Sequence, residues 1–178
     1  MYKRQVLETY KVRDGNIRLY KENILLKGFI KEIIEEMQPI AQKTNNTLEF
    51  IQQRDIRVYA DRIQLKRVIK NLIQNAISYG EPNFPIEVSI GEIPQYIVIK
   101  VKDYGAGISK TDIDKIFNKY YSAAKKFRKI GTGLGLYLAL QIIKSHNGEL
   151  SVESEEGNFT EFTIKLPAVM NINLHYGE

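Results

Sequence analysis

Residues 61 to 79, DRIQLKRVIKNLIQNAISY, decide the fold of this chain. Apolar residues recur along this stretch at three- and four-residue spacing, which predicts an amphipathic helix. They are Ile63, Leu65, Val68, Ile69, Leu72, Ile73 and Ala76. Asp61, with Gln64 three residues on, resembles a capping box that opens the helix, and Gly80-Glu81-Pro82 ends it.

A polar stripe on this helix carries candidate ligands. Asn71, Asn75 and Ser78 follow i, i+4, i+7 spacing, so they align beside the apolar face. An asparagine oxygen suits an Mg²⁺ ion that phosphate oxygens already hold, because Mg²⁺ keeps most of its octahedral shell from water and phosphate. Taken alone, the same stripe also fits a solvated polar edge, so both interpretations stay open at this point.

Helical and strand patterns alternate on both sides of the central helix. Helices are predicted over 28–42, 110–117 and 133–146, and strands over 48–51, 56–59, 86–90, 96–101, 150–153 and 159–166. Asn147-Gly148 is a typical left-handed stop for the last helix. This order predicts an α+β fold in which helices cover one face of a sheet.

The strand that begins at residue 96 runs into a carboxylate and a glycine-bearing loop. Alternation places Asp103 at the end of an apolar row, which predicts a position at the mouth of a pocket. Gly105 and Gly107 allow a tight turn and a close backbone approach, as a planar base or a phosphate requires. A glycine-rich turn without a ligand is the alternative.

A second glycine cluster, Gly131-Thr132-Gly133-Leu134-Gly135-Leu136, leads directly into the last helix. The first N–H groups of a helix have no internal partner, and with the positive end of the helix dipole they favour phosphate. Lys125, Lys126, Arg128 and Lys129 precede the cluster. They fit a basic segment that folds over a polyphosphate or, equally, a solvated run of charge.

Length and composition bound the class of protein. With 178 residues, no cysteine and a net charge of +5, the chain can bury its own core and has no thiolate metal site or catalytic thiol. It shows neither an apolar run of the about 18 residues that span a membrane nor a signal-peptide h-region. We therefore expect a cytoplasmic domain without membrane contact, within a parent protein that is anchored or free. No nucleic acid is expected, because the aromatic residues form no stacking pattern.

In order along the chain, these motifs resemble the four boxes of the ATP-binding catalytic domain of two-component sensor histidine kinases. Their superfamily includes gyrase-type ATPases and anti-sigma serine kinases. The boxes are Asn71–Ala76 with Tyr79, Asp103–Ile108, Ile116-Phe117 with Tyr120-Tyr121, and Gly131–Leu136. The resemblance implies a Bergerat-type two-layer α/β sandwich, with a mixed, mostly antiparallel sheet covered on one face by three main helices.

The same resemblance implies ATP and Mg²⁺ as ligands. The counterpart of Asp103 accepts the adenine amino group, that of Asn75 holds Mg²⁺, and the glycines flank a flexible lid over the phosphates. The catalytic pair is Asn71 and Asn75. The residues implied to bind ATP are Asn71, Asn75, Tyr79, Asp103, Gly105, Gly107, Ile108, Phe117, Tyr120, Lys126, Arg128, Gly131, Thr132, Gly133, Leu134, Gly135, Leu136 and Thr160.

Asn71 separates two kinds of chemistry within the superfamily. Hydrolytic members and serine kinases usually carry Glu here as a general base, and an amide cannot take that proton. Asn71 therefore favours transfer of the γ-phosphate to a histidine on another domain, where the protein mainly positions and neutralises the phosphate. A hydrolytic ATPase or serine kinase of the superfamily and a degenerate nucleotide-binding module are the alternatives.

The resemblance also implies a domain organisation and partners. Residues 1–27 are expected to be the tail of a dimerisation and phosphoacceptor helix with its connector, 28–167 the catalytic domain and 168–178 a tail. The implied partners are the dimerisation and phosphoacceptor histidine domain of the same protein and the receiver domain of a response regulator. We expect the phosphoacceptor histidine to lie outside this chain, because His146 fits a helix end that the dipole favours.

The chain departs from the family pattern in three places. Ser78 stands where Lys or Arg is common, which removes one expected phosphate contact. Tyr120 and Ser122 stand where the phenylalanine box often has basic residues. Phe159 replaces the usual glycine before Thr160.

Overall fold

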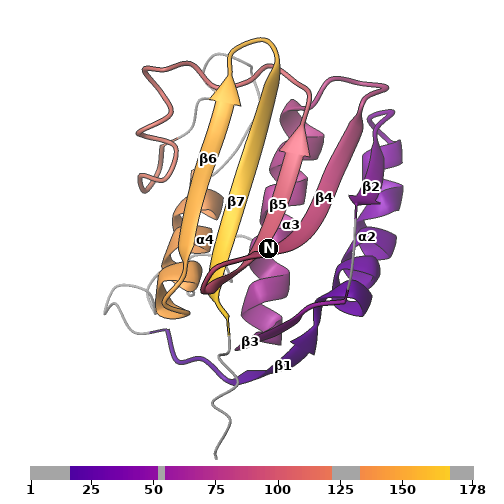
Figure 1. Cartoon of the computed structure of the whole chain (residues 1–178). Coiled ribbons are helices and arrows are strands. Elements are labelled where there is room, and N and C mark those ends of the chain that lie inside the picture. The colour runs from indigo at the N-terminus through magenta and orange to yellow at the C-terminus, as the bar shows by residue number, and fades with distance from the viewer. Residues whose placement is uncertain (1–16, 52–54, 122–132, 169–178) are drawn as a thin grey trace, which may run out of the picture.

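The computed structural model describes residues 17–51, 55–121 and 133–168. In chain order its elements are β1 Lys21–Leu25, α2 Leu26–Gln42, β2 Thr47–Ile51, β3 Arg57–Asp61, α3 Arg62–Tyr79, β4 Pro85–Ile93, β5 Tyr96–Asp103, α4 Gly135–Ser145, β6 Glu149–Glu155 and β7 Phe159–Pro167. The helices α2, α3 and α4 lie side by side on one face of a five-stranded sheet (Figure 1). This arrangement confirms the predicted two-layer sandwich.

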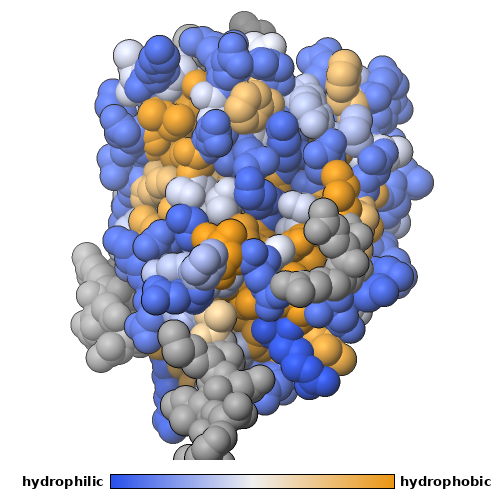
Figure 2. Space-filling model, viewed as in Figure 1, coloured by the Kyte–Doolittle hydropathy of each residue, from blue (hydrophilic) through white to orange (hydrophobic). Residues whose placement is uncertain are grey.

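The main sheet is mixed and mostly antiparallel, with the strand order β2-β4-β5-β7-β6. Only the pairing of β2 with β4 is parallel. Alternate residues of β4, β5 and β7 are buried beneath the helices, while residues such as Lys100, Glu161 and Lys165 face the other side. Figure 2 shows this outer face as largely hydrophilic. The period-two pattern therefore fixes which face of the sheet meets the helices.

The central helix α3 supplies the middle of the core. It packs on β5 and lies between α2, which contacts β2, and α4, which contacts β6. The predicted apolar stripe is buried from Leu65 to Ala76, so this part of the prediction is confirmed. Ile63 is an exception, because it is 78% exposed and lies outside the core. The first turn of α3 extends past the edge of the core, and the helical period alone does not show where that edge lies.

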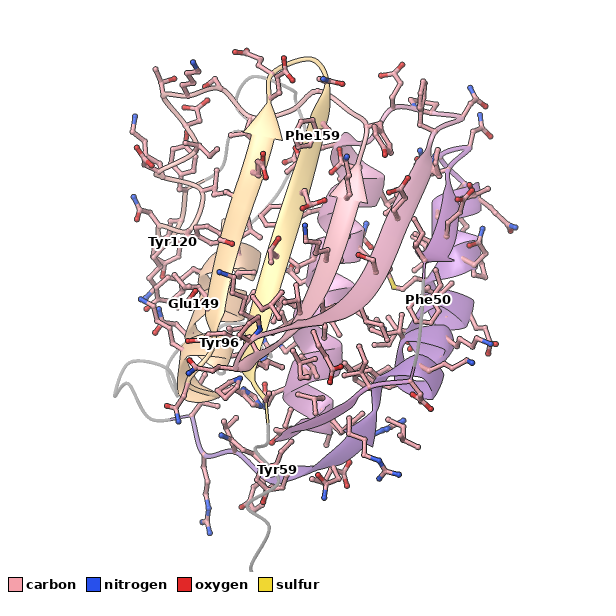
Figure 3. All side chains as sticks on the ribbon, in the orientation of Figure 1. Phe50, Tyr59, Tyr96, Tyr120, Glu149 and Phe159 are labelled. Atoms are coloured by element: carbon pink, nitrogen blue, oxygen red, sulfur yellow. The ribbon has the colours of Figure 1, made fainter. Side chains whose placement is uncertain are left out.

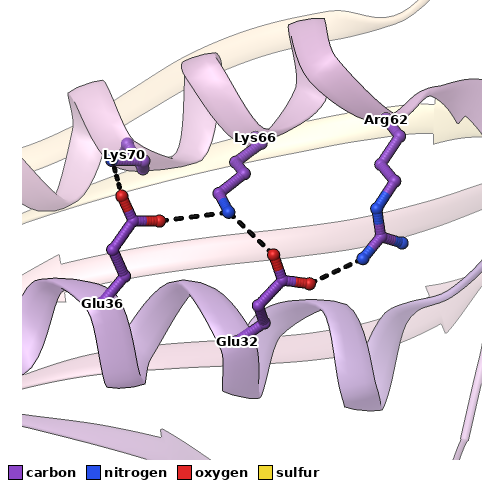
Figure 4. Close-up of polar contacts among 5 residues, drawn as sticks. All are labelled: Glu32, Glu36, Arg62, Lys66 and Lys70. Atoms are coloured by element: carbon purple, nitrogen blue, oxygen red, sulfur yellow. Dashed lines mark hydrogen bonds and ion pairs between the residues drawn. The ribbon is translucent and has the colours of Figure 1, made fainter.

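A ladder of ion pairs aligns α2 with α3 on the solvent side (Figure 4). Glu32 accepts from Arg62 at 2.6 Å and from Lys66 at 2.8 Å, and Glu36 pairs with Lys66 at 3.1 Å and with Lys70 at 2.5 Å. Hydrogen bonds from Lys66 and Lys70 lower the pKa values of Glu32 and Glu36. These groups are exposed, so salt screens them and they set the register of the helices more than the stability of the fold.

A separate two-stranded ribbon of β1 and β3 lies at the lower end of the molecule in Figure 1. Strand β1, which the sequence pattern does not predict, pairs antiparallel with β3 and brings Ile24 opposite Val58. Both side chains are buried. Because β1 gains its hydrogen-bond partner only from a strand more than 30 residues further on, its local sequence carries little signal of the pairing. Residues 1–16 lie outside the described part of the chain.

The prediction of a helix over residues 110–117 is wrong. The segment consists of successive turns, in which Asp112 N donates to Ser109 O at 3.0 Å and Lys115 N to Asp112 O at 2.8 Å. Asn118 N donates to Lys115 O at 2.9 Å in the same i to i+3 pattern. A segment this short has too few helical hydrogen bonds to offset the cost of nucleation, and tertiary contacts decide its conformation instead.

His146 ends α4, as predicted, but not as a cation favoured by the helix dipole. The residue is 2% exposed, with Nδ1 2.8 Å from Ile142 O and Nε2 3.0 Å from Asp61 N. The carbonyl can only accept and the amide can only donate, so the ring is neutral with its proton on Nδ1. Burial lowers the pKa of His146 and thereby stabilises this form.

The same contact alters the predicted capping box at the start of α3. The Asp61 side chain accepts from Gln64 N at 2.9 Å, which confirms the N-cap. The backbone N–H of Asp61, which would meet the Gln64 side chain in a full capping box, donates to His146 instead. One buried hydrogen bond therefore joins the start of α3 to the end of α4.

We expect His146→Ala to lower the free energy of unfolding at pH 7.5 by about 2 kcal/mol, because it leaves a cavity and an unpaired buried N–H. The pKa of His146 is lowered in the folded protein, so the stabilisation is complete above the ordinary value of 6.5 and is lost as the pH falls below it. Urea unfolding of both proteins should therefore show a smaller difference at pH 5.5 than at pH 7.5. An equal difference at the two pH values would contradict the neutral assignment.

Candidate functional site

Segments from four parts of the chain meet around the C-terminal half of α3. The end of this helix contacts the loop after β5, where Gly80 pairs with Gly105 and Ala106 N donates to Tyr79 O at 3.2 Å. The start of α4 packs beside the middle of α3, at Asn71. The turn between β6 and β7 contacts the same loop, because Gly157 N donates to Ala106 O at 2.8 Å. The motifs identified in the sequence thus come together in space.

Asp103 is the buried charged group of this site. It is the last residue of β5 and is 3% exposed, and its Oδ1 atom is buried with no hydrogen-bond partner. Burial raises the pKa of Asp103 to about 7, although the backbone N–H of Gly105 acts in the opposite direction. A buried acceptor without a donor is costly and uncommon. The atom is therefore poised to accept a hydrogen bond from a ligand N–H.

The two asparagines of α3 lie half-buried, one helical turn apart. Asn71 Nδ2 is buried with no partner, and Asn71 Oδ1 lies so near Gly135 that a Cβ there would approach it to 2.4 Å. The amide thus faces the first turn of α4, where backbone N–H groups lack helical partners. A solvated polar edge does not describe Asn71, whose donor is enclosed and unpaired. Asn75 lies one turn nearer to the loop that follows Asp103.

The loop after Asp103 requires its glycines. A Cβ on Gly105 would approach Tyr79 O to 1.9 Å, and one on Gly107 would approach Glu155 O to 2.1 Å. Gly107 also has φ +63°, a conformation that L side chains rarely adopt. Both predicted glycines therefore bring this loop into backbone contact with α3 and with the β6–β7 turn.

Thr160 lies beside Asp103 on the inner face of the sheet. The two residues are direct partners between β5 and β7, and Thr160 is 5% exposed. Phe159, the departure from the family pattern, points to the opposite face, where Lys102 Nζ lies 4.8 Å from its ring centroid. Figure 3 shows Phe159 at the start of β7, at this end of the sheet. Its side chain is thus kept out of the site.

A backbone contact joins Tyr120 to Gly133, the residues on either side of the segment predicted to cover the phosphates. Tyr120 N donates to Gly133 O at 3.0 Å, and Gly133 has φ +64° with no room for a Cβ against the backbone of Tyr120. The ring of Phe117 packs edge-on against Phe162, with centroids 6.4 Å apart. The Tyr120 side chain is 66% exposed. Four predicted residues lie outside the described part of the chain, namely Lys126, Arg128, Gly131 and Thr132.

Most of the remaining predicted residues pack against the core. Ile108, Phe117 and Leu136 are partly buried against the core, and Leu134 O accepts from Leu138 N at 2.9 Å in the first turn of α4. Tyr79 is half-buried at the end of α3, and burial raises the pKa of its hydroxyl. The apolar members of the boxes therefore position the backbone, while polar groups are presented by Asn71, Asp103 and Thr160.

Ser154 is a residue of this site that the sequence analysis missed. Its Oγ accepts a hydrogen bond from Ile108 N at 2.9 Å and lies 3.1 Å from Thr160 Oγ1. A signal was present, because Leu150, Val152 and Ser154 alternate on one face of β6. Ser154 ends that apolar row as Asp103 ends the row of β5.

Comparison with known proteins gives the class of this site. Residues 60–170 match the family described as histidine kinase-, DNA gyrase B- and HSP90-like ATPase. The sequence is 32% identical over 168 residues to the sensor histidine kinase WalK of Bacillus subtilis strain 168, covering 91% of this chain and 27% of that protein. It is 34% identical over 166 residues to the sensor protein kinase WalK of Staphylococcus epidermidis, with the same coverage of 91% and 27%.

Solved structures agree with this assignment. The catalytic domain of the histidine kinase ThkA, in a nucleotide-free form, superimposes with a TM-score of 0.75 at 28% identity, covering 84% of this chain and 97% of that one. The histidine kinase AdeS of Acinetobacter baumannii shares the fold, with a TM-score of 0.77 at 23% identity over 93% of this chain and 76% of that one.

The chain therefore belongs to the histidine kinase-, DNA gyrase B- and HSP90-like ATPase family, and it shares the fold of histidine kinase catalytic domains. Within that family it is similar to the ATP-binding catalytic domains of sensor histidine kinases. It spans about a quarter of the length of the WalK proteins it matches first, 27% in each case. Over the described residues, no helix is both long and apolar enough to cross a membrane.

Asp103→Asn should stabilise the free protein at alkaline pH. Because burial raises the pKa of Asp103 from 3.8 to about 7, the folded protein favours the protonated form, and the stability that this gives is present below pH 3.8 and lost as the pH rises from there to about 7. We expect the variant to gain about 2 kcal/mol in free energy of unfolding over wild type at pH 8 and about 0 at pH 4. Denaturant titrations at both pH values test this. A variant that is less stable at pH 8 would refute the proposed burial cost.

Gly135→Ala should disturb the site by displacing Asn71. The added Cβ would lie 2.4 Å from Asn71 Oδ1, so we expect a loss of about 1–3 kcal/mol in stability. Gly28→Ala is the matched control, since its Cβ would meet nothing within 4 Å in α2 and should gain about 0.5–1 kcal/mol. Thermal unfolding of the two variants gives the comparison. Equal effects would show that Gly135 does not constrain Asn71.

Proposed function

We propose that this chain binds ATP with Mg²⁺ and transfers the γ-phosphoryl group to a histidine of a dimerisation domain in the same protein. The observation that carries the proposal is the buried, unpartnered Oδ1 atom of Asp103 at the end of β5. An adenine amino group supplies the donor that this acceptor lacks. Membership of the ATPase family and similarity to sensor kinases support the same assignment.

The polar groups between α3 and α4 fit a polyphosphate. Asn71 Nδ2 is an enclosed donor without a partner, and it faces the first turn of α4 with its free backbone N–H groups. Both kinds of group donate to anionic oxygens, and the helix dipole adds a favourable field. We assign Lys126, Arg128, Gly131 and Thr132, which lie outside the described residues, to the segment that closes over the phosphates.

The site also fits Mg²⁺ held jointly by protein and phosphate. Asn75 is half-buried one turn from Asn71, and its amide oxygen is a neutral ligand of the hard type that Mg²⁺ accepts. When bound, the ion would neutralise charge on the phosphates. Asn71 and Asn75 form the catalytic pair in this assignment, with Asn75 as the metal ligand.

The proposed reaction breaks the bond between the γ-phosphorus and its bridging oxygen and forms a bond from phosphorus to an imidazole nitrogen. ADP leaves, and the imidazole proton passes to a base that the phosphoacceptor domain or solvent provides. Asn71 cannot accept that proton, so the chain's own task is to bind, orient and neutralise. The same property disfavours a hydrolytic ATPase or a serine kinase, both of which need a base to activate their nucleophile.

The wider assembly is part of the proposal. We assign residues 1–27 to the end of the phosphoacceptor helix and its connector, 28–167 to the catalytic domain and 168–178 to a tail. The receiver domain of a response regulator then takes the phosphoryl group from histidine. This places the domain in the cytoplasm, where ATP and response regulators occur.

Calorimetric titration with ADP, with and without Mg²⁺, tests the nucleotide site. The wild-type chain should bind ADP and should bind it more tightly with Mg²⁺. Asp103→Asn should weaken binding at least about 30-fold, because the amide turns a donor toward the base or loses the charge of the acceptor. Ser89→Ala, on the outer face of β4, serves as the control. ADP binding that survives Asp103→Asn unchanged would exclude this pocket as the adenine site.

The Asn75→Ala variant tests the contribution of Mg²⁺ to affinity separately from that of the adenine base. We expect it to abolish the gain in affinity that Mg²⁺ gives, while affinity for ADP without Mg²⁺ changes less than about threefold. Phosphorylation of a separately supplied phosphoacceptor domain by the wild-type chain, and its loss in Asn75→Ala, would then connect the site to the transfer reaction. If the variant kept the full response to Mg²⁺, Asn75 would not be the metal ligand.

A further inference from the structure

Three polar side chains form a row across the inner face of the sheet. Thr160 on β7 pairs with Asp103 of β5 on one side and with Ser154 of β6 on the other, both in antiparallel register. Residues paired in this way have Cβ atoms about 5 Å apart, so their side chains are within reach of one another. Asp103 and Thr160 are both buried. The row therefore lies at the enclosed end of the candidate site.

The hydrogen bonds of Ser154 determine where the protons lie. Ser154 Oγ is 2.6 Å from Phe159 O, and because a carbonyl oxygen can only accept, Ser154 donates its single proton there. Its Oγ accepts from Ile108 N at 2.9 Å. The same atom lies 3.1 Å from Thr160 Oγ1. Since Ser154 has no proton left, Thr160 must be the donor in this last contact.

The donation of the Thr160 hydroxyl to Ser154 explains a second observation. Thr160 is the direct neighbour of Asp103 and carries a hydroxyl proton, yet Asp103 Oδ1 has no hydrogen-bond partner in the described part of the chain. The Thr160 hydroxyl that could donate to Oδ1 donates to Ser154 Oγ instead. As a result, Thr160 and the ionised form of Asp103, which is the main form at pH 8, offer lone pairs to a ligand and no hydrogen.

We propose that Ser154 is a specificity-determining residue of the nucleotide site, which selects a base with an exocyclic amino group against a 6-oxopurine. It does so by accepting the hydrogen bond that the Thr160 hydroxyl donates, and it is therefore a positioning residue that does not touch the base. The inference rests on the proposed function, because it needs a base at Asp103. A 6-oxopurine would bring a carbonyl oxygen against a pair of acceptors, and buried polar groups left unpaired strongly disfavour such a ligand.

The test compares ADP with inosine diphosphate, in which an oxygen replaces the amino group. Both nucleotides are titrated calorimetrically at pH 8 into the wild-type chain, Ser154→Ala, Thr160→Val and the double variant. In Ser154→Ala the freed hydroxyl proton of Thr160 can turn toward Asp103 or toward the oxygen of the base. We expect the preference for ADP over inosine diphosphate to fall about tenfold, or about 1.4 kcal/mol.

The double variant tests whether the effect of Ser154→Ala requires the hydroxyl group of Thr160. With valine at position 160 there is no proton to redirect, so Ser154→Ala should leave the preference of Thr160→Val unaltered. Ser151→Ala, at an exposed position of the same strand, is the matched control and should behave as wild type. Thermal unfolding with each nucleotide reports whether the variants remain folded.

Two results would overturn the proposal. A Ser154→Ala variant that loses affinity for both nucleotides by the same factor would show a purely structural role. A tenfold loss of preference that persists with valine at position 160 would show that Ser154 does not act through Thr160. Failure of the proposed function would look different. The wild-type chain would then bind both nucleotides equally, or the Asp103→Asn variant would keep the wild-type preference for ADP.

Discussion

The functional site depends on a carboxylate that the fold holds away from water. Asp103 ends β5, the central strand of the sheet, and its neighbours β4 and β7 fix the backbone on both sides. The burial that raises the pKa of Asp103 leaves one of its oxygens without a donor. In the free protein this arrangement costs stability, and a ligand that donates a hydrogen bond recovers part of the cost. Stability and binding are therefore opposed at a single side chain.

Helix α3 connects this site to the core. Its apolar stripe packs on β5 and against both neighbouring helices, while Asn71 and Asn75 emerge along the edge of the same stripe. The position of the amides is consequently set by the packing of residues such as Leu72 and Ile69, which are fully buried. At the opposite end, the hydrogen bond from Asp61 N to His146 ties α3 to α4. The surface between the two helices that we propose to bind phosphate thus rests on contacts made well away from it.

Glycines decide how closely the elements of the site approach. Gly105, Gly107 and Gly135 each lie where a Cβ would collide with backbone or with Asn71. Their spacing in the sequence therefore reflects three separate contacts, to α3, to the β6–β7 turn and between α3 and α4. This explains why motifs that are weak individually define one site together: each glycine permits an approach that another motif completes.

Much of the fold could be predicted from the sequence because local patterns and burial agree. The stripe of α3, the N-cap at Asp61 and the apolar row that ends at Asp103 all appear in the structure. The predictions failed where a distant partner decides the conformation. Strand β1 forms only against β3, and residues 110–117 form turns because tertiary contacts outweigh a weak helical pattern.

The sequence by itself determined the class of the fold, the face of each element that is buried and the chemical types at the site, because periodicity and backbone preference act over a few residues. The tertiary structure alone decided which polar groups remain without partners and where shared protons lie. Asn71 Nδ2 and Asp103 Oδ1 are unpaired because of what packs around them. Thr160 donates its hydroxyl proton to Ser154 because three strands align in one register. Hydrogen bonds between strands depend on positions in space that no local stretch of sequence specifies.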